Sequence, residues 1–241
     1  GPLFGRNFDL ASFAWMTEMK SKGNLNKLAS AIVRFVSGMV RSVYQPSKYA
    51  IKRGYIHHAV VVQHDDRGLK DTFQKEVYEY AATLMAKHQW HTIVDMGCGS
   101  GYKSAHYLGH YKISGVDFSP AIDQARLDFP SYEWINADEF VPAHHAADLI
   151  ICADVIEHVE DPDQFMKHML AIRDWKCLMI STPERNKRRG RWHYGPPPNP
   201  AHYREWSMEE LKRFVAGYAP VYSTELINPL QGTQLILCRR E

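Results

Sequence analysis

The sequence predicts an α/β protein built on a doubly wound parallel sheet, and two observations support this prediction. From residue 91 onward, short apolar runs rich in β-branched residues alternate with segments of helical periodicity. A glycine-rich loop, MGCGSG, follows the first apolar run at residues 96–101. Strands that alternate with helices form parallel sheets covered on both faces. The length of 241 residues and a hydrophobic content of 45% are sufficient to bury such a core.

The N-terminal part is expected to be helical. Apolar residues at helical spacing over residues 25–43 predict an amphipathic helix, and we expect its apolar stripe to pack on the protein's own core rather than on a membrane. A polar, histidine-rich segment follows at 55–71, and a second helix is expected over 73–88. We expect residues 1–72 to form a helical extension and residues 73–241 to form the main domain.

The remaining elements follow in strict alternation. The predicted strands are residues 91–96, 112–117, 133–136, 147–153, 177–182, 220–228 and 232–240. Helices are expected at 102–111, at 120–128, after the fourth strand up to about residue 172, and at 208–217. Residues 184–207 break the rhythm with a basic, proline-rich insertion, which is too long for an ordinary connection. We expect this insertion to be a mobile lid over the site.

Composition excludes several classes of protein. The net charge of +2 is too small to indicate a nucleic-acid partner by itself. No apolar run approaches the roughly 20 residues that a membrane span needs. The four cysteines are far apart and three of them lie in strand-like runs, which predicts buried thiols in a reduced, cytoplasmic protein without a disulfide framework. The oligomeric state is left open, with a dimer as one option.

The glycine loop indicates a ligand site at the end of the first strand. Glycines at this position allow a close approach of the backbone to a ligand at the start of the following helix. The spacing is G-x-G-x-G and Asp95 stands just before it, whereas a dinucleotide loop has G-x-G-x-x-G and no such carboxylate. Asp95 suits a ligand with a positively charged end.

These motifs resemble those of class I S-adenosylmethionine-dependent methyltransferases. VDMGCGSG resembles their first motif, ADLIICADVIEHVEDP their fourth, and CLMISTP their fifth strand. The resemblance implies a seven-stranded sheet whose last strand is antiparallel. It also implies that Asp117 holds the ribose hydroxyls of S-adenosylmethionine and that Asp138 meets its adenine amino group. The full set of cofactor-binding candidates is Asp95, Gly97, Cys98, Gly99, Gly101, Asp117, Phe118, Asp138 and Asp154.

Asp154, Glu157 and His158 form a D-x-x-E-H motif after the fourth strand. If a helix begins at Asp154, the three side chains share one face of its first turn. Three interpretations remain open. Asp154 and Glu157 could form a helix cap, the residues could contact the cofactor, or they could bind a metal ion.

His202 favours the metal interpretation. The segment HYREW at 202–206, together with the D-x-x-E-H motif, resembles the metal-dependent methyltransferases that modify the 3′-terminal ribose of small RNAs. The resemblance implies a divalent ion held by Asp154, Glu157, His158 and His202. Two carboxylates and two imidazoles suit Mg²⁺, Mn²⁺ or Fe²⁺, and Zn²⁺ stays open. We expect Glu157, His158 and His202 to be catalytic, and without a metal His158 or His202 would be the general base.

The methyl acceptor is predicted from the insertion. Its basic run suits an anionic or nucleotide-linked small molecule, and nearby aromatic rings could stack on a sugar or a base. The pattern also resembles bacterial methyltransferases of glycan and secondary-metabolite pathways. We therefore expect O-methylation of a hydroxyl on a sugar-like or other small polyol metabolite. RNA 3′-terminal ribose 2′-O-methylation, a metal-independent small-molecule methyltransferase and a non-catalytic binding protein are the alternatives. The residues concerned are Lys187, Arg188, Arg189, Arg191, Trp192, Tyr194, Tyr203 and Trp206.

Overall fold

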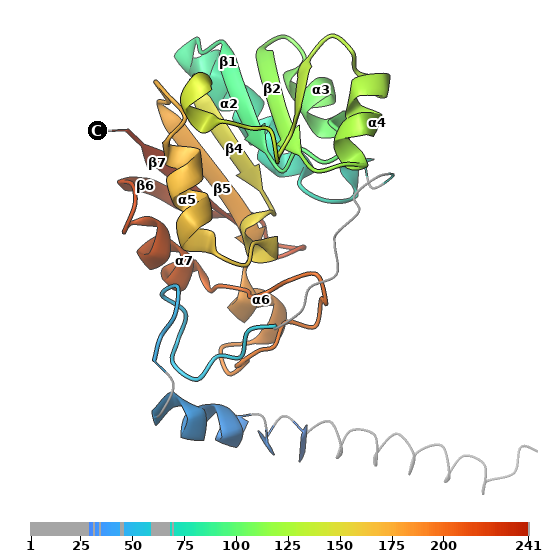
Figure 1. Cartoon of the computed structure of the whole chain (residues 1–241). Helices are drawn as coiled ribbons and strands as arrows, with labels where there is room; N and C mark the ends of the chain where they lie inside the picture. The colour runs from blue at the N-terminus through green and yellow to red at the C-terminus, as the bar shows by residue number, and fades with distance from the viewer. Residues whose placement is uncertain are drawn as a thin grey trace, which may run out of the picture.

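The described part of the computed structural model, residues 29–30, 32–33, 35–43, 46–58, 68 and 70–240, contains a seven-stranded sheet. The strand order is β3-β2-β1-β4-β5-β7-β6 (Figure 1). β1 to β5 pair in parallel, and β7 is antiparallel to both β5 and β6, so the predicted fold class is confirmed. The strands are β1 (Thr92–Met96), β2 (Lys112–Asp117), β3 (Glu133–Asn136), β4 (Leu149–Ala153), β5 (Cys177–Pro183), β6 (Val221–Asn228) and β7 (Thr233–Arg239).

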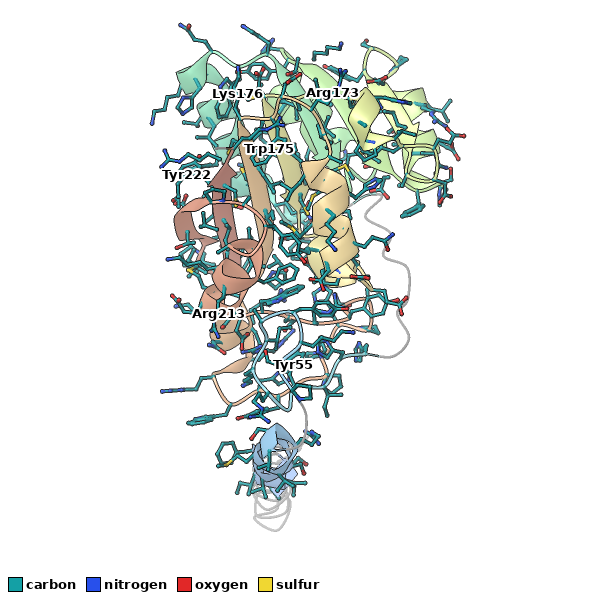
Figure 2. The ribbon with its side chains drawn as sticks, turned by 60° about the vertical axis from the view of Figure 1, so that its left-hand side comes forward. Tyr55, Arg173, Trp175, Lys176, Arg213 and Tyr222 are labelled. Carbon is teal, nitrogen blue, oxygen red and sulfur yellow. The ribbon has the colours of Figure 1, made fainter. Side chains whose placement is uncertain are left out.

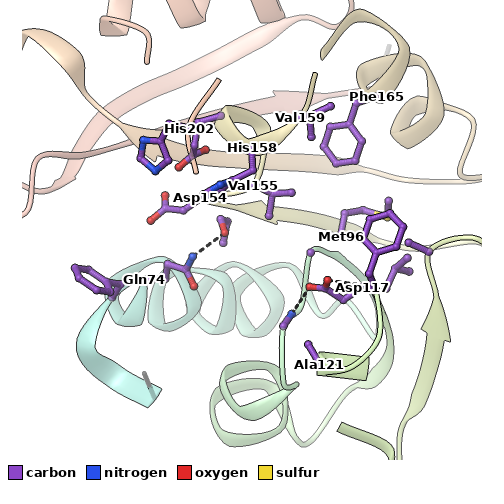
Figure 3. Close-up of a pocket in the computed structure, with 18 of the residues that line it drawn as sticks. Gln74, Met96, Asp117, Ala121, Asp154, Val155, His158, Val159, Phe165 and His202 are labelled. Atoms are coloured by element: carbon purple, nitrogen blue, oxygen red, sulfur yellow. Dashed lines mark hydrogen bonds between the residues drawn. The ribbon is translucent and has the colours of Figure 1, made fainter. Parts of the chain in front are cut away.

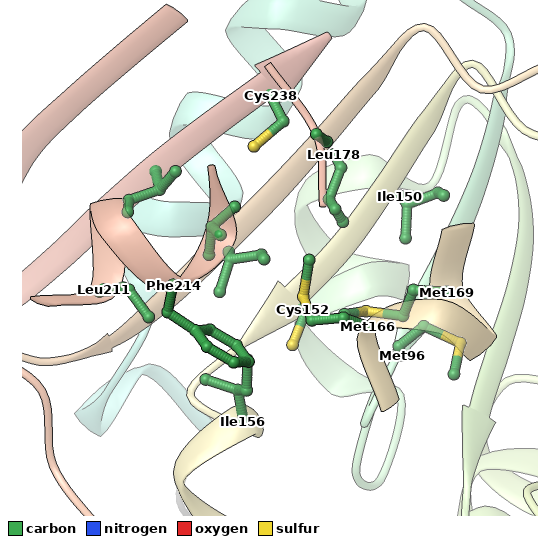
Figure 4. Packing of buried hydrophobic residues seen from close by; sticks show 14 of the residues in the cluster. Met96, Ile150, Cys152, Ile156, Met166, Met169, Leu178, Leu211, Phe214 and Cys238 are labelled. Atoms are coloured by element: carbon green, nitrogen blue, oxygen red, sulfur yellow. The ribbon is translucent and has the colours of Figure 1, made fainter. Parts of the chain in front are cut away.

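Helices cover both faces of the sheet because the strands are apolar on both sides. In β4, Leu149 and Ile151 pack with α2, whereas Ile150 and Cys152 pack with α5 and α7 (Figure 4). Alternate residues of a strand point to opposite faces, so one fully apolar run serves two cores. The helices are α2 (Lys75–His88), α3 (Tyr102–Leu108), α4 (Ala121–Asp128), α5 (Pro162–Leu170), α6 (Arg185–Arg189) and α7 (Met208–Val215), with short 3₁₀ turns η1 (Lys70–Thr72), η2 (Pro142–His144) and η3 (Ile156–His158).

Residues 46–58 and the insertion lie together at one end of the domain. Lys176 precedes β5 and Tyr55 lies at the opposite end of the domain (Figure 2). Tyr55 belongs to residues 46–58, which pack beside the insertion 184–207. Tyr55 is part of the main core cluster, so this stretch is built into the domain. The boundary expected at residues 72 and 73 stays a prediction.

The helix cap proposed for Asp154 is wrong. Asp154 has a left-handed backbone with φ of 53°, and its carboxylate accepts a hydrogen bond of 2.8 Å from the Ser181 hydroxyl. The helix begins only at Pro162, where the Asp161 carboxylate accepts hydrogen bonds from two backbone N–H groups. Aspartate followed by proline is the stronger start signal, because the carboxylate satisfies free N–H groups and proline needs none.

The insertion is closed at its base rather than being a simple loop. Glu184 and Trp206 form a β-bridge, and the backbone N–H of Arg185 donates to the Trp206 carbonyl at 2.8 Å. Arg185 is fully buried and its guanidinium lies 2.6 Å from the Glu210 carboxylate. Such a pair is costly to break, since either partner alone would be an uncompensated buried charge. These contacts fix both ends of the insertion, whereas the expected mobility of the lid stays a prediction.

The apolar stripe of the N-terminal helix does not pack on the core. The described residues among 29–43 are helical, but the large apolar side chains of the stripe are each more than half exposed: Ile32, Val33, Val36, Met39, Val40 and Val43. The expectation of a core helix is therefore wrong for these residues, and residues 25–28 lie outside the described part. No helix in the described ranges is both long and apolar enough to cross a membrane.

Candidate active site

A cavity of about 650 Å³ lies where β1, β2 and β4 end at their carboxyl edge (Figure 3). Open α/β sheets bind ligands at this edge, and the volume is typical of small-molecule sites. Eight of the predicted site residues line the cavity: Gly97, Gly99, Asp117, Phe118, Asp154, Glu157, His158 and His202. The glycine loop and the D-x-x-E-H motif therefore face one shared space.

The glycine loop lies tightly against the segment that follows β4. Gly97 has φ of 79°, and a Cβ on it would lie 2.2 Å from a methyl group of Val155. Only glycine fits this conformation and this approach. The carboxylate of Asp117 accepts the N–H of Gly99 at 2.6 Å and that of Phe118 at 2.7 Å. A carboxylate has about four acceptor positions, so these two hydrogen bonds do not by themselves saturate Asp117.

Asp95 lies behind the wall of the cavity and is fully buried. One carboxylate oxygen accepts hydrogen bonds from Ser104 and from Tyr78, the latter at 3.0 Å. The other oxygen is buried without a hydrogen-bond partner. Burial raises the pKa of Asp95 to about 6, against the effect of these two hydrogen bonds. The arrangement suits a nearby cationic group, because a positive charge would stabilise the ionised carboxylate.

Three other predicted cofactor residues do not line the cavity. Cys98 is buried, and Gly101 caps α3 close to the Trp134 ring. Asp138 is exposed, while its neighbour Ala137 lines the cavity. Cys98 and Gly101 thus shape the loop from behind, and the contact of Asp138 with adenine stays a prediction.

Glu157, His158 and His202 form a compact cluster, with one ligand atom of each lying within 4.8 Å of those of the others. The rings of His158 and His202 are 4.7 Å apart and nearly perpendicular. Asp154 also lines the cavity, but it is not a member of this cluster. The structure therefore brings together three of the four predicted metal ligands, including the distant His202.

Hydrogen bonds fix how both imidazoles are oriented. Nδ1 of His158 lies 2.7 Å from the Ala201 carbonyl, which can only accept, so this nitrogen carries the proton. Nδ1 of His202 lies 3.0 Å from the Glu205 carboxylate and is likewise the donor. In the neutral rings both Nε2 atoms therefore carry the lone pair. Histidine ligands of metals are commonly held in this way by an oxygen acceptor.

The acids of the site lie in a strongly desolvated environment. One Glu157 oxygen accepts from the Thr182 hydroxyl at 2.8 Å, and the other is buried without a partner. Burial, followed by the negative charge of Asp154, raises the pKa of Glu157 well above its ordinary value. Burial also raises the pKa of Asp154. Burial alone would raise the pKa of Glu205 too, but the hydrogen bond and charge of His202 lower it.

Several lining residues had no motif to reveal them. Gln74 donates to the Ala153 carbonyl at 2.9 Å and Lys103 is a buried lysine at the cavity. The Asn199 side chain lies 2.9 Å from Nε2 of His202. Gln74 and Asn199 could be identified as lining residues only from the folded structure, which brings distant segments together at the cavity. Lys103 could have been predicted from the sequence, because it lies at the start of the helix directly after the glycine loop.

The residues expected to contact the methyl acceptor are divided between the cavity lining and other parts of the domain. Tyr203 and Arg188 line the cavity, whereas Trp206 is a core residue and Trp192 lies on the surface against Phe35. His58 and His64 belong to the histidine-rich segment at 55–71, and His58 donates to the His202 carbonyl at 2.8 Å without lining the cavity. His64 lies outside the described residues. The expectation that Trp206 stacks on a ligand is wrong, because its ring is needed in the core.

The known proteins that are similar to this chain are methyltransferases, in agreement with the features of the site. A family model described as a methyltransferase domain matches residues 62–218. A ubiquinone biosynthesis O-methyltransferase of Coxiella burnetii is 30% identical over 118 residues, covering 45% of this chain and 48% of that protein. A small RNA 2′-O-methyltransferase of Arabidopsis thaliana is 26% identical over 217 residues, covering 71% of this chain and 23% of that protein. The chain thus spans about half or less of these relatives.

Solved structures share the fold. The methyltransferase domain of bacterial CtHen1-C matches with a TM-score of 0.54 and 18% identity, over 69% of this chain and 97% of that one. The plantazolicin methyltransferase BpumL in complex with SAH matches with a TM-score of 0.55 and 14% identity, over 73% and 87% of the two chains.

The chain belongs to the methyltransferase domain family. This agrees with the class of methyltransferases that the ordered motifs predicted.

Substitution of Asp117 tests the cofactor site. Asp117→Ala is expected to weaken S-adenosylmethionine binding at least about tenfold, because hydroxyl donors lose a charged acceptor. Asp123→Ala is the matched control, since Asp123 is an exposed aspartate of α4 outside the cavity lining and should retain the affinity. Titration calorimetry measures both. Unchanged affinity in Asp117→Ala contradicts the assignment, and an equal loss in Asp138→Ala would place Asp138 at the adenine.

Proposed function

We propose that the protein transfers a methyl group to a hydroxyl of a sugar-like or other small polyol metabolite, assisted by a divalent metal ion. The observation that carries this proposal is the cluster of Glu157, His158 and His202 at one wall of the cavity. A methyltransferase needs alignment of donor and acceptor and a means of removing the acceptor's proton. The cluster is the group of side chains suited to the second task.

The side chains at the cluster fit a divalent ion. Glu157 has a buried oxygen without a hydrogen-bond partner, and acceptors behind the two imidazoles leave the lone pair of each ring on Nε2. The Nε2 lone pair of His202 accepts from the Asn199 amide at 2.9 Å, so an ion would take the place of this hydrogen bond. One carboxylate and two imidazoles suit Mn²⁺, Fe²⁺ or Zn²⁺ well. Mg²⁺ prefers oxygen ligands, so it would be held mainly by carboxylates. Glu157, His158 and His202 would hold the ion, with Asp154 adding a second carboxylate nearby. A bound ion would lower the pKa of an acceptor hydroxyl.

The chain's own residues would position the reactants. Asp117 would hold the ribose hydroxyls of S-adenosylmethionine, which supplies the methyl group, while the glycine loop allows close approach. Glu205 would keep the His202 ring oriented, because its buried carboxylate accepts the proton of Nδ1. A bound ion would use the Nε2 lone pairs, so the acidified hydroxyl would release its proton to Asp154, which also lines the cavity, or to water. Without a metal, the same two imidazoles would remain as the general base.

Arg188 and Tyr203 support an anionic, ring-containing acceptor. Arg188 is the member of the basic run that lines the cavity, and its alkyl stem lies close to Gly232. Tyr203 lines the same cavity and its backbone N–H donates to the Glu157 carbonyl at 2.8 Å. A guanidinium binds phosphate or carboxylate oxygens well, and a tyrosine ring packs on a sugar. Both residues therefore lie where an acceptor would approach the cluster.

RNA with a 3′-terminal ribose is the second candidate acceptor. The similarity to the Arabidopsis small RNA 2′-O-methyltransferase extends over 71% of this chain, more than the 45% covered by the Coxiella relative. A terminal ribose presents the vicinal hydroxyls that the proposed site would take. The modest net charge of +2 favours a small acceptor, since extended RNA contacts need many cations.

Chelation is expected to abolish methyl transfer while cofactor binding persists. The reason is that the cluster acts on the acceptor hydroxyl, whereas Asp117 and the glycine loop lie elsewhere in the cavity. His202→Ala should reduce turnover at least about a hundredfold, as loss of a proton-removing device does. His144→Ala, at an exposed histidine outside the cavity, is the matched control. Metal analysis of the purified protein and an activity assay before and after chelation measure this.

Full activity after exhaustive chelation would contradict the proposal that a metal ion assists methyl transfer. If His202→Ala still lost activity in that case, His202 would be a plain general base.

Arg188→Ala is expected to raise the KM for the acceptor about tenfold or more with little change in S-adenosylmethionine affinity. The reason is that a charge-assisted bond to an anionic group is removed. Lys187→Ala is the control, because Lys187 is exposed, belongs to the same basic run and does not line the cavity. Kinetics with candidate nucleotide-linked sugars, phosphorylated polyols and short RNAs measure the effect. Equal kinetics in both variants would show that the run is only a solvated surface.

A further inference from the structure

One helix face has no packing partner among the residues that the structure describes. Ile32, Val36, Met39 and Val43 recur at spacings of three and four residues, and Val33 and Val40 widen the stripe. All six side chains are more than half exposed. Contiguous exposed apolar surface of this kind on a soluble domain marks an interaction site. We call these six residues the apolar face.

The helix is attached through its opposite side, so the apolar face points away from the domain. Gly38 lies against the Tyr194 ring, where a Cβ would come within 2.5 Å. Arg41 donates to the Gly54 carbonyl at 3.4 Å and Arg53 donates to the Val43 carbonyl at 3.1 Å. Figure 1 shows the helix at one end of the molecule, separated from the sheet by residues 46–58 and the insertion.

The surface around the apolar face is positively charged. The sequence from residue 29 to residue 58 contains lysines and arginines but no aspartate or glutamate. In the neighbouring insertion, Lys187 and Arg191 are exposed and the acidic Glu184 is buried. Arg191 lies over the Trp192 ring, and this exposed ring contacts Phe35 of the helix at 5.0 Å. Cations and an exposed tryptophan therefore border the apolar face.

This combination favours one class of partner. A second copy of the chain would bring two positively charged surfaces of the same kind together, which is unfavourable. A nucleic acid would match the cations but would leave the apolar face in water. An anionic lipid surface matches both, because amphipathic helices bury apolar side chains among acyl chains while flanking cations and tryptophan lie at the headgroups.

We propose that this end of the protein binds the surface of an anionic lipid bilayer, with the apolar face and Trp192 inserted at the interface. Arg53 and Arg191 contact lipid headgroups beside it. The insertion that carries Arg191 also carries Arg188, which lines the cavity. The methyltransferase site is therefore linked by a short, partly buried segment to the membrane-binding end. This inference does not depend on the metal or on the identity of the acceptor.

Flotation of the full chain with lipid vesicles tests the proposal. Vesicles of phosphatidylcholine alone are compared with vesicles containing about 30% phosphatidylglycerol, at low and high salt. The wild-type chain should partition to the anionic vesicles at least about tenfold more strongly, and high salt should weaken this binding. The double variant Val36→Ser/Val40→Ser should lose about tenfold or more in binding without any change of charge.

Leu127→Ser is the matched control, because Leu127 is an apolar side chain on α4 that is also exposed. Thermal melting shows that each variant is folded, which is expected since all three positions are exposed. The proposal is overturned by equal partitioning to both kinds of vesicle, by wild-type binding of the double serine variant, or by equal loss in Leu127→Ser. A stable dimer in sedimentation velocity that the double variant dissociates also overturns it and assigns the face to a second copy.

Discussion

The closure of the insertion against the body of the domain is the constraint on which the active site depends. Arg204 is buried and donates to the carbonyls of Val159 and Glu160, at 2.5 and 2.7 Å, just after the D-x-x-E-H motif. Tyr203 donates to Glu157 from the same segment. Because a buried guanidinium must satisfy its donors, this position is strongly specified. His202, two residues before Arg204, is thereby held against Glu157.

The same closure explains why the site can be charged yet buried. The Arg185–Glu210 pair and the Glu184–Trp206 bridge hold the base of the insertion. The residues of the insertion that line the cavity lie within a few residues of this base: Arg188, Asn199, His202 and Tyr203. Behind the cluster, Glu205 orients His202 and is itself stabilised by that ring, followed by Arg189 and Arg188. The negative charge of Glu205 behind His202 is therefore balanced by positive charge on the insertion.

Much of the fold was predictable because it is encoded locally. Alternating apolar runs gave the strands and glycine spacing gave the loop, and the order of motifs placed Asp117 and His202 at one cavity. The failures involve information that local patterns lack. The apolar stripe at 32–43 indicates contact with an apolar surface, but the pattern does not show which surface this is. Likewise, the sequence around Trp206 does not show whether its ring packs in the core or against a ligand. The helix-cap interpretation of Asp154, one of three left open, is excluded because the helix begins after Asp161 at Pro162.

The central claim is that Glu157, His158 and His202 form a metal centre beside the cofactor. The most direct measurement is a crystal structure with S-adenosylhomocysteine and Mn²⁺, with diffraction data collected to show anomalous scattering from manganese. The account predicts a single strong anomalous peak in contact with all three side chains and with the cofactor in the adjacent part of the cavity. A cofactor-bound structure without a peak at this cluster, at a saturating metal concentration, would contradict it.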